Sequence, residues 1–155
     1  MFAFLQAMKH LMIVCFLGLL IKAQGQNEED AILGKWESVE KNLIVEVYKQ
    51  EGTFKAKVVW FYDENDTITP IEERLDTENP NKSLRNRKIL GLQVLSGLVY
   101  NAKQKRWVNG KIYDSSSGRT WSATVWLTDA NTLNVRGYYL VRWLGKTLTF
   151  TRVPG

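Results

Sequence analysis

The feature that most constrains this chain is a pair of residues near its two ends. Gly34-Lys35-Trp36 begins the alternating part of the sequence, and Arg152 stands three residues from the end. The residues between them form short alternating segments that are typical of β-strands. A Trp in the first strand and an Arg in the last can meet only if the sheet closes on itself. We therefore expect a small barrel in which Trp36 and Arg152 make a structural cation–π contact, worth about 0.5–2 kcal/mol.

The alternation predicts eight strands, and almost all of them are joined by short turns. This pattern favours an all-β fold, an eight-stranded up-and-down antiparallel barrel. In the third segment, for example, Phe54, Ala56, Val58 and Trp60 are expected on one face of the sheet. The predicted strands are Leu33–Glu40, Leu43–Lys49, Thr53–Tyr62, Ile89–Leu95, Trp107–Asp114, Arg119–Leu127, Thr132–Arg142 and Lys146–Val153.

One connection is much longer than a hairpin turn. Residues 63–88, between the third and fourth predicted strands, are polar and contain two prolines. Asn79-Pro80 has the pattern of an N-cap followed by proline at the first helical position, which predicts a short helix over 80–87. Residues 97–106 are expected to form a second loop. A connection as long as 63–88 in a compact domain is usually functional or mobile.

The N-terminal residues have the pattern of a secretory signal peptide. Lys9 and His10 precede an apolar run, Leu11–Ile21, and small residues at Ala23 and Gly25 precede the expected cleavage site. We predict a signal peptide over 1–25, a barrel domain over 26–155, and a periplasmic or extracellular location. The alternative is an uncleaved anchor, but eleven apolar residues fall short of the roughly 20 that a spanning helix needs. We expect no membrane span in the mature chain.

Cleavage at that site would remove the only His and the only Cys of the chain, His10 and Cys15. The mature protein would then lack imidazole and thiolate ligands for metals, Ser-His or Cys-His catalysis and disulfides, so we predict no metal and no cofactor. The mature chain would carry 19 basic and 16 acidic residues, a net charge of +3. This mild excess, without a nucleic-acid motif, does not indicate a nucleic-acid partner.

Charge is unevenly distributed, and this suggests a binding site. Residues 63–78 carry seven acids and one base, whereas residues 79–113 carry eight bases and no acid. Arg85 and Arg87 could bind a carboxylate or phosphate through bidentate hydrogen bonds. The alternative is that this basic stretch simply pairs with the acidic stretch before it. Both hold if the pairing fastens a lid over the barrel mouth.

Other candidate ligand-binding residues lie on the strands. Trp60, Trp121 and Tyr139 could line a pocket, since an eight-stranded barrel is either filled by side chains or holds one small ligand. Arg136 lies opposite the apolar face of its strand and would point outward; in a barrel with a polar interior it would bind an anion, with Asp114 or Glu46 as its counter-charge. The run Asp63-Glu64-Asn65-Asp66-Thr67 lacks the central Gly of a calcium loop and is expected to be a solvated turn.

Two resemblances to known families support these expectations. Gly34-Lys35-Trp36 together with the terminal Arg152 resembles the signature of calycins, the group that includes lipocalins. The runs 79–92, 107–120 and 133–138 are similar to blocks of the domain of unknown function 2147 family of small exported bacterial proteins. The chain departs from that family at Ser115, Trp121 and Phe150, where Pro, Tyr and Trp are frequent. The resemblance implies export and a calycin-like barrel and supplies no activity.

Three hypotheses for the function follow. The first is a non-enzymatic exported barrel that binds a small amphipathic or anionic molecule, with Arg85 and Arg87 near the mouth. The second is a filled barrel that acts as an interaction or scaffold protein of the cell envelope. The third is a carboxylate-based enzyme acting on an envelope polymer, which would need two acidic side chains to converge in a cleft.

Overall fold

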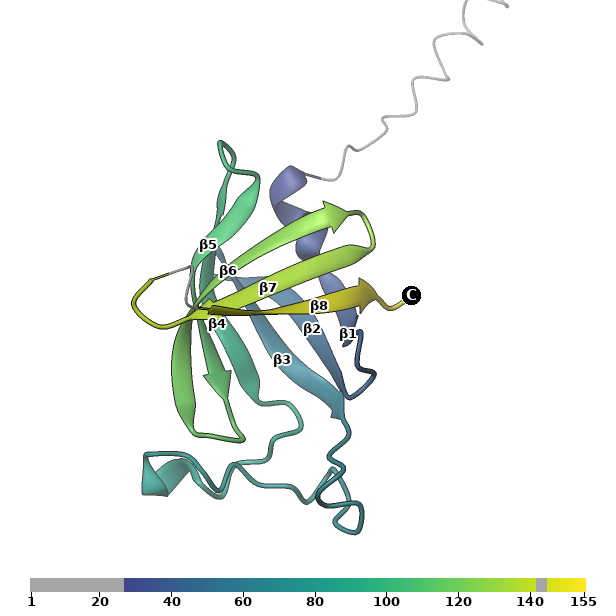
Figure 1. Ribbon diagram of the computed structural model, residues 1–155, viewed down its shortest axis with the longest axis vertical. Coiled ribbons are helices and arrows are strands. Elements are labelled where there is room, and N and C mark those ends of the chain that lie inside the picture. Colours follow the sequence, from purple (N-terminus) through teal and green to yellow (C-terminus); the bar gives the residue numbers. More distant parts are fainter. Residues whose placement is uncertain (1–26, 142–144) are drawn as a thin grey trace, which may run out of the picture.

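Eight antiparallel strands form a closed barrel in the computed structural model, which describes residues 27–141 and 145–155 (Figure 1). Each strand pairs with its successor, and β8 pairs with β1 to close the ring. The predicted up-and-down barrel is therefore confirmed. The signal peptide predicted for 1–25 lies outside the described residues. The strands are β1 (Gly34–Ser38), β2 (Leu43–Gln50), β3 (Thr53–Phe61), β4 (Gln93–Asn101), β5 (Arg106–Asp114), β6 (Arg119–Asp129), β7 (Thr132–Tyr138) and β8 (Gly145–Arg152).

Apolar side chains on alternate positions of the strands fill the interior. In β3, Phe54, Ala56 and Val58 are buried, and in β6, Ala123 and Val125 are buried. Their neighbours in sequence point to the outer face, because successive side chains of a strand alternate between the two faces of the sheet. The barrel thus has one apolar inner face and one largely solvated outer face.

One end of the barrel is sealed by the N-terminal segment. A 3-10 helix, η1 (Glu28–Ile32), precedes β1, and Ile32 is fully buried. The indole N–H of Trp36 donates to the Ile32 carbonyl oxygen (2.8 Å), and that of Trp107 donates to the Glu29 carbonyl oxygen (2.9 Å). The Trp36 and Trp107 indoles therefore hold η1 in place through hydrogen bonds and fill the barrel interior next to it.

Arg152 crosses the same end of the barrel. Its guanidinium carbon lies 4.1 Å from the centroid of the Trp36 ring, and Trp36 is 0% exposed. Arg152 also pairs with Trp36 in the β1–β8 register. First and last strands therefore meet where this cation–π contact lies.

Several predicted boundaries are wrong. The fourth strand runs over Gln93–Asn101 and not Ile89–Leu95, so the expected loop over 97–106 shrinks to a turn after Asn101. Gly97 causes this error: it lies within β4 at a positive φ of 70° and does not end the strand. The seventh strand ends at Tyr138.

The helix predicted over 80–87 is also wrong. Only a 3-10 turn, η2 (Lys82–Leu84), is present, and its N-cap is Asn81, whose side chain accepts from the Ser83 N–H (3.1 Å). The side chain of Asn79, the predicted N-cap, instead donates to the Asp76 carboxylate (2.8 Å).

The long connection between β3 and β4 lies at the end of the barrel opposite η1 (Figure 1). In an up-and-down barrel, the β1–β2, β5–β6 and β7–β8 connections share that end. The connection is held by an isolated β-bridge between Leu75 and Lys88 and by backbone hydrogen bonds between Val58 and residues Gly91 and Leu92. We call this end of the barrel the mouth.

Candidate ligand cavity

The mouth half of the barrel contains a cavity of about 560 Å³. Pockets of roughly 300–1,000 Å³ are typical of small-molecule sites. The inner faces of the strands and the β3–β4 connection both contribute to the lining. It consists of Leu43, Val45, Ala56, Val58, Phe61, Tyr62, Asp63, Arg74, Leu75, Thr77, Glu78, Ile89, Val94, Leu95, Ile112, Tyr113, Asp114, Ser115, Ser116, Val135, Leu148 and Phe150.

A difference in side-chain size between the two halves of the barrel contributes to the cavity. The sealed half contains Trp36, Phe54 and Trp107, and the Phe54 and Trp107 rings pack edge to face with centroids 6.4 Å apart. In the mouth half, smaller side chains such as Ala56 and Val58 occupy the inner positions. Aromatic rings fill an eight-stranded barrel, whereas alanine and valine leave space for one small ligand.

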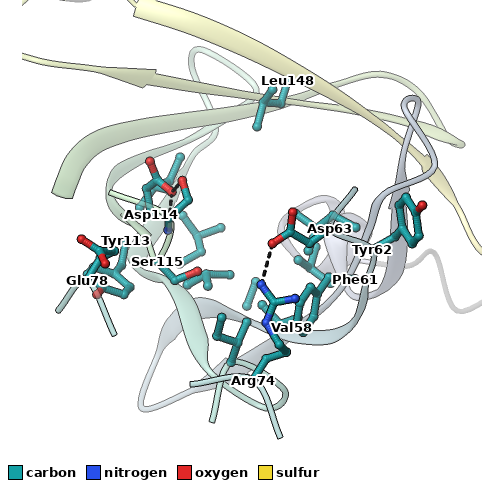
Figure 2. A pocket seen from close by; sticks show the side chains of 18 of the residues that line it. Val58, Phe61, Tyr62, Asp63, Arg74, Glu78, Tyr113, Asp114, Ser115 and Leu148 are labelled. Atoms are coloured by element: carbon teal, nitrogen blue, oxygen red, sulfur yellow. Dashed lines mark hydrogen bonds and ion pairs between the residues drawn. The ribbon is translucent and has the colours of Figure 1, made fainter. Parts of the chain in front are cut away.

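One side of the mouth is formed by an ion pair (Figure 2). Arg74 Nη2 lies 2.5 Å from Asp63 Oδ2, and Arg74 Nη1 lies 3.2 Å from Asp66 Oδ2. The hydrogen bond from Arg74 is the main cause that lowers the pKa of the Asp63 carboxyl. Asp63 is therefore ionised at neutral pH and tied to the guanidinium.

Asp114, Tyr113, Ser115 and Glu78 lie on the other side of the mouth (Figure 2). Asp114 Oδ1 accepts from the Ser116 N–H (3.0 Å) and hydroxyl (2.7 Å), and Oδ2 accepts from the Ser117 hydroxyl (2.6 Å). Burial raises the pKa of the Asp114 carboxyl, but these hydrogen bonds outweigh it and the net shift is downward. Asp114 is thus a fixed anion in the cavity wall.

A buried carboxylate fastens the β3–β4 connection to the barrel. Asp76 is 0% exposed and accepts from the Tyr113 hydroxyl (2.6 Å), Asn79 Nδ2 (2.8 Å) and Arg87 Nε (2.8 Å). Asn79 Nδ2 also donates to the Tyr113 hydroxyl oxygen (3.0 Å), and Arg85 Nε donates to the Asn79 carbonyl oxygen (2.8 Å). We call these five residues the Asp76 cluster. Because Tyr113 also lines the cavity, the cluster joins the mouth to the cavity wall.

Of the charged residues predicted to bind a ligand, only Asp114 lines the cavity. Arg85 and Arg87 belong to the Asp76 cluster, and the Arg87 guanidinium lies over the Tyr113 ring, 5.3 Å from its centroid. Arg136 donates to the Thr147 hydroxyl (2.9 Å), and Glu46 pairs with Lys57 (3.0 Å). The pairing of basic with acidic residues in the 63–88 connection is therefore present at Arg87 and Asp76.

The aromatic residues predicted to line a pocket lie outside its lining. Trp60 is 37% exposed, and Trp121 packs edge to face on Tyr139, itself 63% exposed, with centroids 6.2 Å apart. A β-bulge explains Trp60: Ile44 pairs with Trp60 but Val45 pairs with Val58, so β3 has one extra residue. The extra residue turns Trp60 outward and Phe61 inward, which reverses the predicted alternation.

Sequence reasoning missed Asp63, Arg74, Glu78 and Tyr113 as mouth residues and Asp76 as a buried group. The available signals were the Asp-rich start of the long connection and the single Arg within its acidic run. In residues 27–141 and 145–155, no group of three or more His, Cys, Asp or Glu side chains is placed to hold a metal. No helix in those ranges is both long and apolar enough to cross a membrane.

Comparison with known proteins identifies the family. The model of the family described as "Uncharacterized protein conserved in bacteria (DUF2147)" matches residues 34–152, from the first residue of β1 to the last of β8. The chain belongs to this family. No curated protein matches this DUF2147 chain.

A solved structure has the same fold as this DUF2147 protein. It is that of "Protein HP1028 from the human pathogen Helicobacter pylori belongs to the lipocalin family", with a TM-score of 0.65 and 26% sequence identity. The similarity covers 79% of this chain and 83% of that chain. The lipocalin-like barrel expected from the sequence is thus confirmed.

Proposed function

We propose that this DUF2147 protein is a non-enzymatic binding protein that holds one small amphipathic molecule in its barrel. The observation that carries the proposal is the cavity of about 560 Å³, whose walls are apolar and whose polar groups gather at the mouth. The apolar part of a ligand would displace water from Val45, Val58 and Leu148, and its polar end would remain at the mouth. The similarity to a lipocalin-family protein supports a binding role.

Two other functions receive less support. A filled barrel acting only as a scaffold has no use for a cavity of this size. A carboxylate-based hydrolase needs a general acid with a raised pKa, whereas the pKa values of Asp63 and Asp114 are both lowered. Hydrogen bonds from Arg74 and from Ser116 and Ser117 hold these two groups in the ionised form, which cannot donate a proton.

The proposal is tested by filling the cavity. Leu148 lines the cavity and is half-buried, so Leu148→Trp would place a larger ring in the space a ligand needs. We expect the purified protein to bind a lipophilic fluorescent probe and to retain lipid in native mass spectrometry. In Leu148→Trp we expect probe affinity to fall about tenfold, the equivalent of 1.4 kcal/mol.

The matched control is Val99→Trp, because Val99 is 45% exposed and does not line the cavity. Probe affinity should be unchanged in this variant. Stability gives a second criterion: overfilling a packed core costs about 1–3 kcal/mol, whereas adding a ring to an empty space costs less. A wild-type protein that binds no probe, together with a strongly destabilised Leu148→Trp variant, would contradict a hollow barrel.

A further inference from the structure

The charged residues that line the cavity are mostly acidic. Asp63, Glu78 and Asp114 contribute three carboxylates, and Arg74 contributes the single guanidinium. The protein as a whole carries a net charge of +5, so the sign of the lining is opposite to that of the chain. A ligand that enters this cavity meets a local charge that the overall composition does not predict.

The one cation in the lining is already neutralised. Arg74 pairs with both Asp63 (2.5 Å) and Asp66 (3.2 Å) and also donates to the Asp66 carbonyl oxygen (3.1 Å). Of the two arginines in the Asp76 cluster, Arg87 is paired with the buried Asp76 carboxylate (2.8 Å). Arg85 donates to the Asn79 carbonyl oxygen, and neither arginine lines the cavity. An anionic ligand in the cavity would have to break the Arg74 pairs or leave its own charge without a cation among the lining residues, and both carry a cost.

The two carboxylates on the opposite side are not neutralised by a cation of the described residues. Asp114 accepts hydrogen bonds from Ser116 and Ser117, which are neutral donors and leave its negative charge in place. Glu78 is exposed, and within the described part of the chain its side chain has no hydrogen-bond or ion-pair partner. In Figure 2, Glu78, Tyr113 and Asp114 lie on one side of the pocket, and Asp63 lies on the other.

We propose that the ligand is a cationic amphiphile, an alkyl or aryl amine, whose ammonium group binds at Asp114 and Glu78 while its apolar part occupies the barrel. This inference rests on the proposed function, since it names the chemical class of the molecule the cavity holds. An ammonium group is a cation with three donors and no acceptor, so it complements carboxylates whose charge is not already paired. Its attraction to the mouth is greater than in bulk water because the adjoining cavity is apolar.

Three probes with the same apolar chain and different head groups separate the contribution of charge from that of the apolar chain. Decylammonium, decanol and decanoate, each below its micelle concentration, are titrated into the purified protein at pH 7 by calorimetry. We expect decylammonium to bind about tenfold more tightly than decanoate, since a hydrogen bond to a charged group contributes about 1.5–3 kcal/mol. Decanol should lie between them. Added salt should weaken decylammonium binding and leave decanol binding nearly unchanged.

Variants assign the preference to the named carboxylates. Asp114→Asn and Glu78→Gln should each reduce the ratio of decylammonium to decanoate affinity by about threefold or more and leave decanol affinity within about twofold. Glu78→Gln is the safer variant for folding because its side chain is exposed and without a partner among the described residues. Asp129→Asn is the matched control: Asp129 accepts from the Asn131 N–H (2.8 Å) in a turn at the sealed end, outside the cavity lining.

The outcomes are distinct. If none of the three probes binds, the proposed function fails. If the probes bind but decanoate binds as tightly as decylammonium or more tightly, the binding function stands and the cationic ligand is overturned. If the preference for the amine survives in both Asp114→Asn and Glu78→Gln, the assignment of the ammonium site to these carboxylates is overturned.

Discussion

At the scale of single residues, Arg152 illustrates how one side chain can hold two ends of a chain together. Its Nη2 donates to the Ala31 carbonyl oxygen (2.6 Å), its Nη1 to the Leu33 carbonyl oxygen (2.9 Å), and its Nε to the Ala130 carbonyl oxygen (3.0 Å). These acceptors belong to the segment that seals the barrel and to the β6–β7 turn. The planar guanidinium, with its five donors, fits this arrangement in a way that an ammonium cannot.

We therefore expect Arg152→Ala to lower the free energy of unfolding by about 2–4 kcal/mol, because it leaves carbonyl groups unsatisfied and removes the cation–π contact. Arg152→Lys should recover about half of that loss, since it keeps the charge over Trp36 without the three-way hydrogen bonding. Urea denaturation measures both. Arg119→Ala, at an exposed arginine on β6, serves as the control and should change stability by no more than about 0.5 kcal/mol. Equal stability of Arg152→Ala and wild type would show that η1 seals the barrel without Arg152.

At the scale of elements, the β3–β4 connection is ordered by the Asp76 cluster. Burial alone raises the pKa of the Asp76 carboxyl, but hydrogen bonds from Tyr113, Asn79 and Arg87 outweigh it, so the net shift is downward. A lowered pKa means that the ionised form is bound more favourably in the folded than in the unfolded protein. The cluster therefore stabilises the connection in its ionised state.

Asp76→Asn is expected to lower the free energy of unfolding by about 2 kcal/mol at pH 7, since it removes a charged acceptor of three hydrogen bonds. The effect depends on pH in a defined direction. Ionised Asp76 makes its full contribution to the free energy of unfolding above about pH 3.9, the pKa of an Asp in the unfolded chain. This contribution is lost as the pH falls through the lower pKa of Asp76 in the folded protein. The difference between wild type and Asp76→Asn should therefore shrink in acid. Urea denaturation between pH 7 and pH 2.5 measures it, and a difference that is constant with pH would contradict an ionised Asp76.

Two tyrosines provide a matched control for the cluster. The Tyr113 hydroxyl donates to the buried Asp76, whereas the Tyr100 hydroxyl donates to the exposed Glu28 carboxylate (2.9 Å). Tyr113→Phe should be destabilising by about 1.5–3 kcal/mol, as expected for a buried bond to a charged group, and Tyr100→Phe by less than about 1 kcal/mol. Equal effects of the two substitutions would mean that burial of Asp76 adds nothing to its bonds.

The β3 and β4 strands show which parts of this architecture the sequence could predict. The alternation of Phe54, Ala56 and Val58 correctly predicts an inner face, because period-2 patterning follows directly from strand geometry. The outward turn of Trp60 depends on a bulge against β2, and a bulge is a property of the pairing between strands. The same holds for Gly97. A glycine in the sequence is compatible with a loop and with an irregular strand, and only the pairing of β4 with its neighbours decides between them.

At the scale of the whole molecule, closure of the barrel was predictable from Trp36 and Arg152, but the hollow mouth half was not. Whether an eight-stranded barrel is filled depends on which inner positions share a layer, and those layers follow from the register of all eight strands. Of the mouth residues, Asp114 was predicted, as a counter-charge for Arg136 in a barrel with a polar interior, and it lines the cavity without Arg136. Arg74 and Glu78 belong to an irregular connection, where no periodicity indicates the direction of a side chain.

Two of the runs that resemble the DUF2147 family meet at the mouth. Asn79 and Arg87, from the run 79–92, contact Asp76 and Tyr113, and Tyr113 belongs to the run 107–120. Gly118, from the second run, packs against the Glu78 backbone so closely that a Cβ built on it would lie 2.0 Å from the Glu78 carbonyl oxygen. The blocks thus build one structure, the attachment of the β3–β4 connection to the β5–β6 turn.

The organisation of the whole chain predicts where it can be shortened. We propose that residues 1–25 are a signal peptide and that the exported protein begins at Gln26, which leaves η1 intact to seal the barrel. The exported protein should therefore have the intact mass of residues 26–155, and a chain begun at Gln26 should keep full stability and probe binding. Beginning the chain at Leu33 instead would remove Ile32, the hydrogen-bond acceptor of Trp36, and Ala31, an acceptor of Arg152.

For the chain that begins at Leu33, we expect a loss of more than about 3 kcal/mol, from the uncovered Trp36 and Trp107 indoles and their unsatisfied N–H groups. Thermal and urea denaturation of the two truncated chains measure this difference directly. If the two truncated chains were equally stable, η1 would not be needed to close this end of the barrel. If the exported protein kept its first 25 residues, the signal peptide would be wrong while the η1 comparison stood unaffected, because the two measurements probe separate segments.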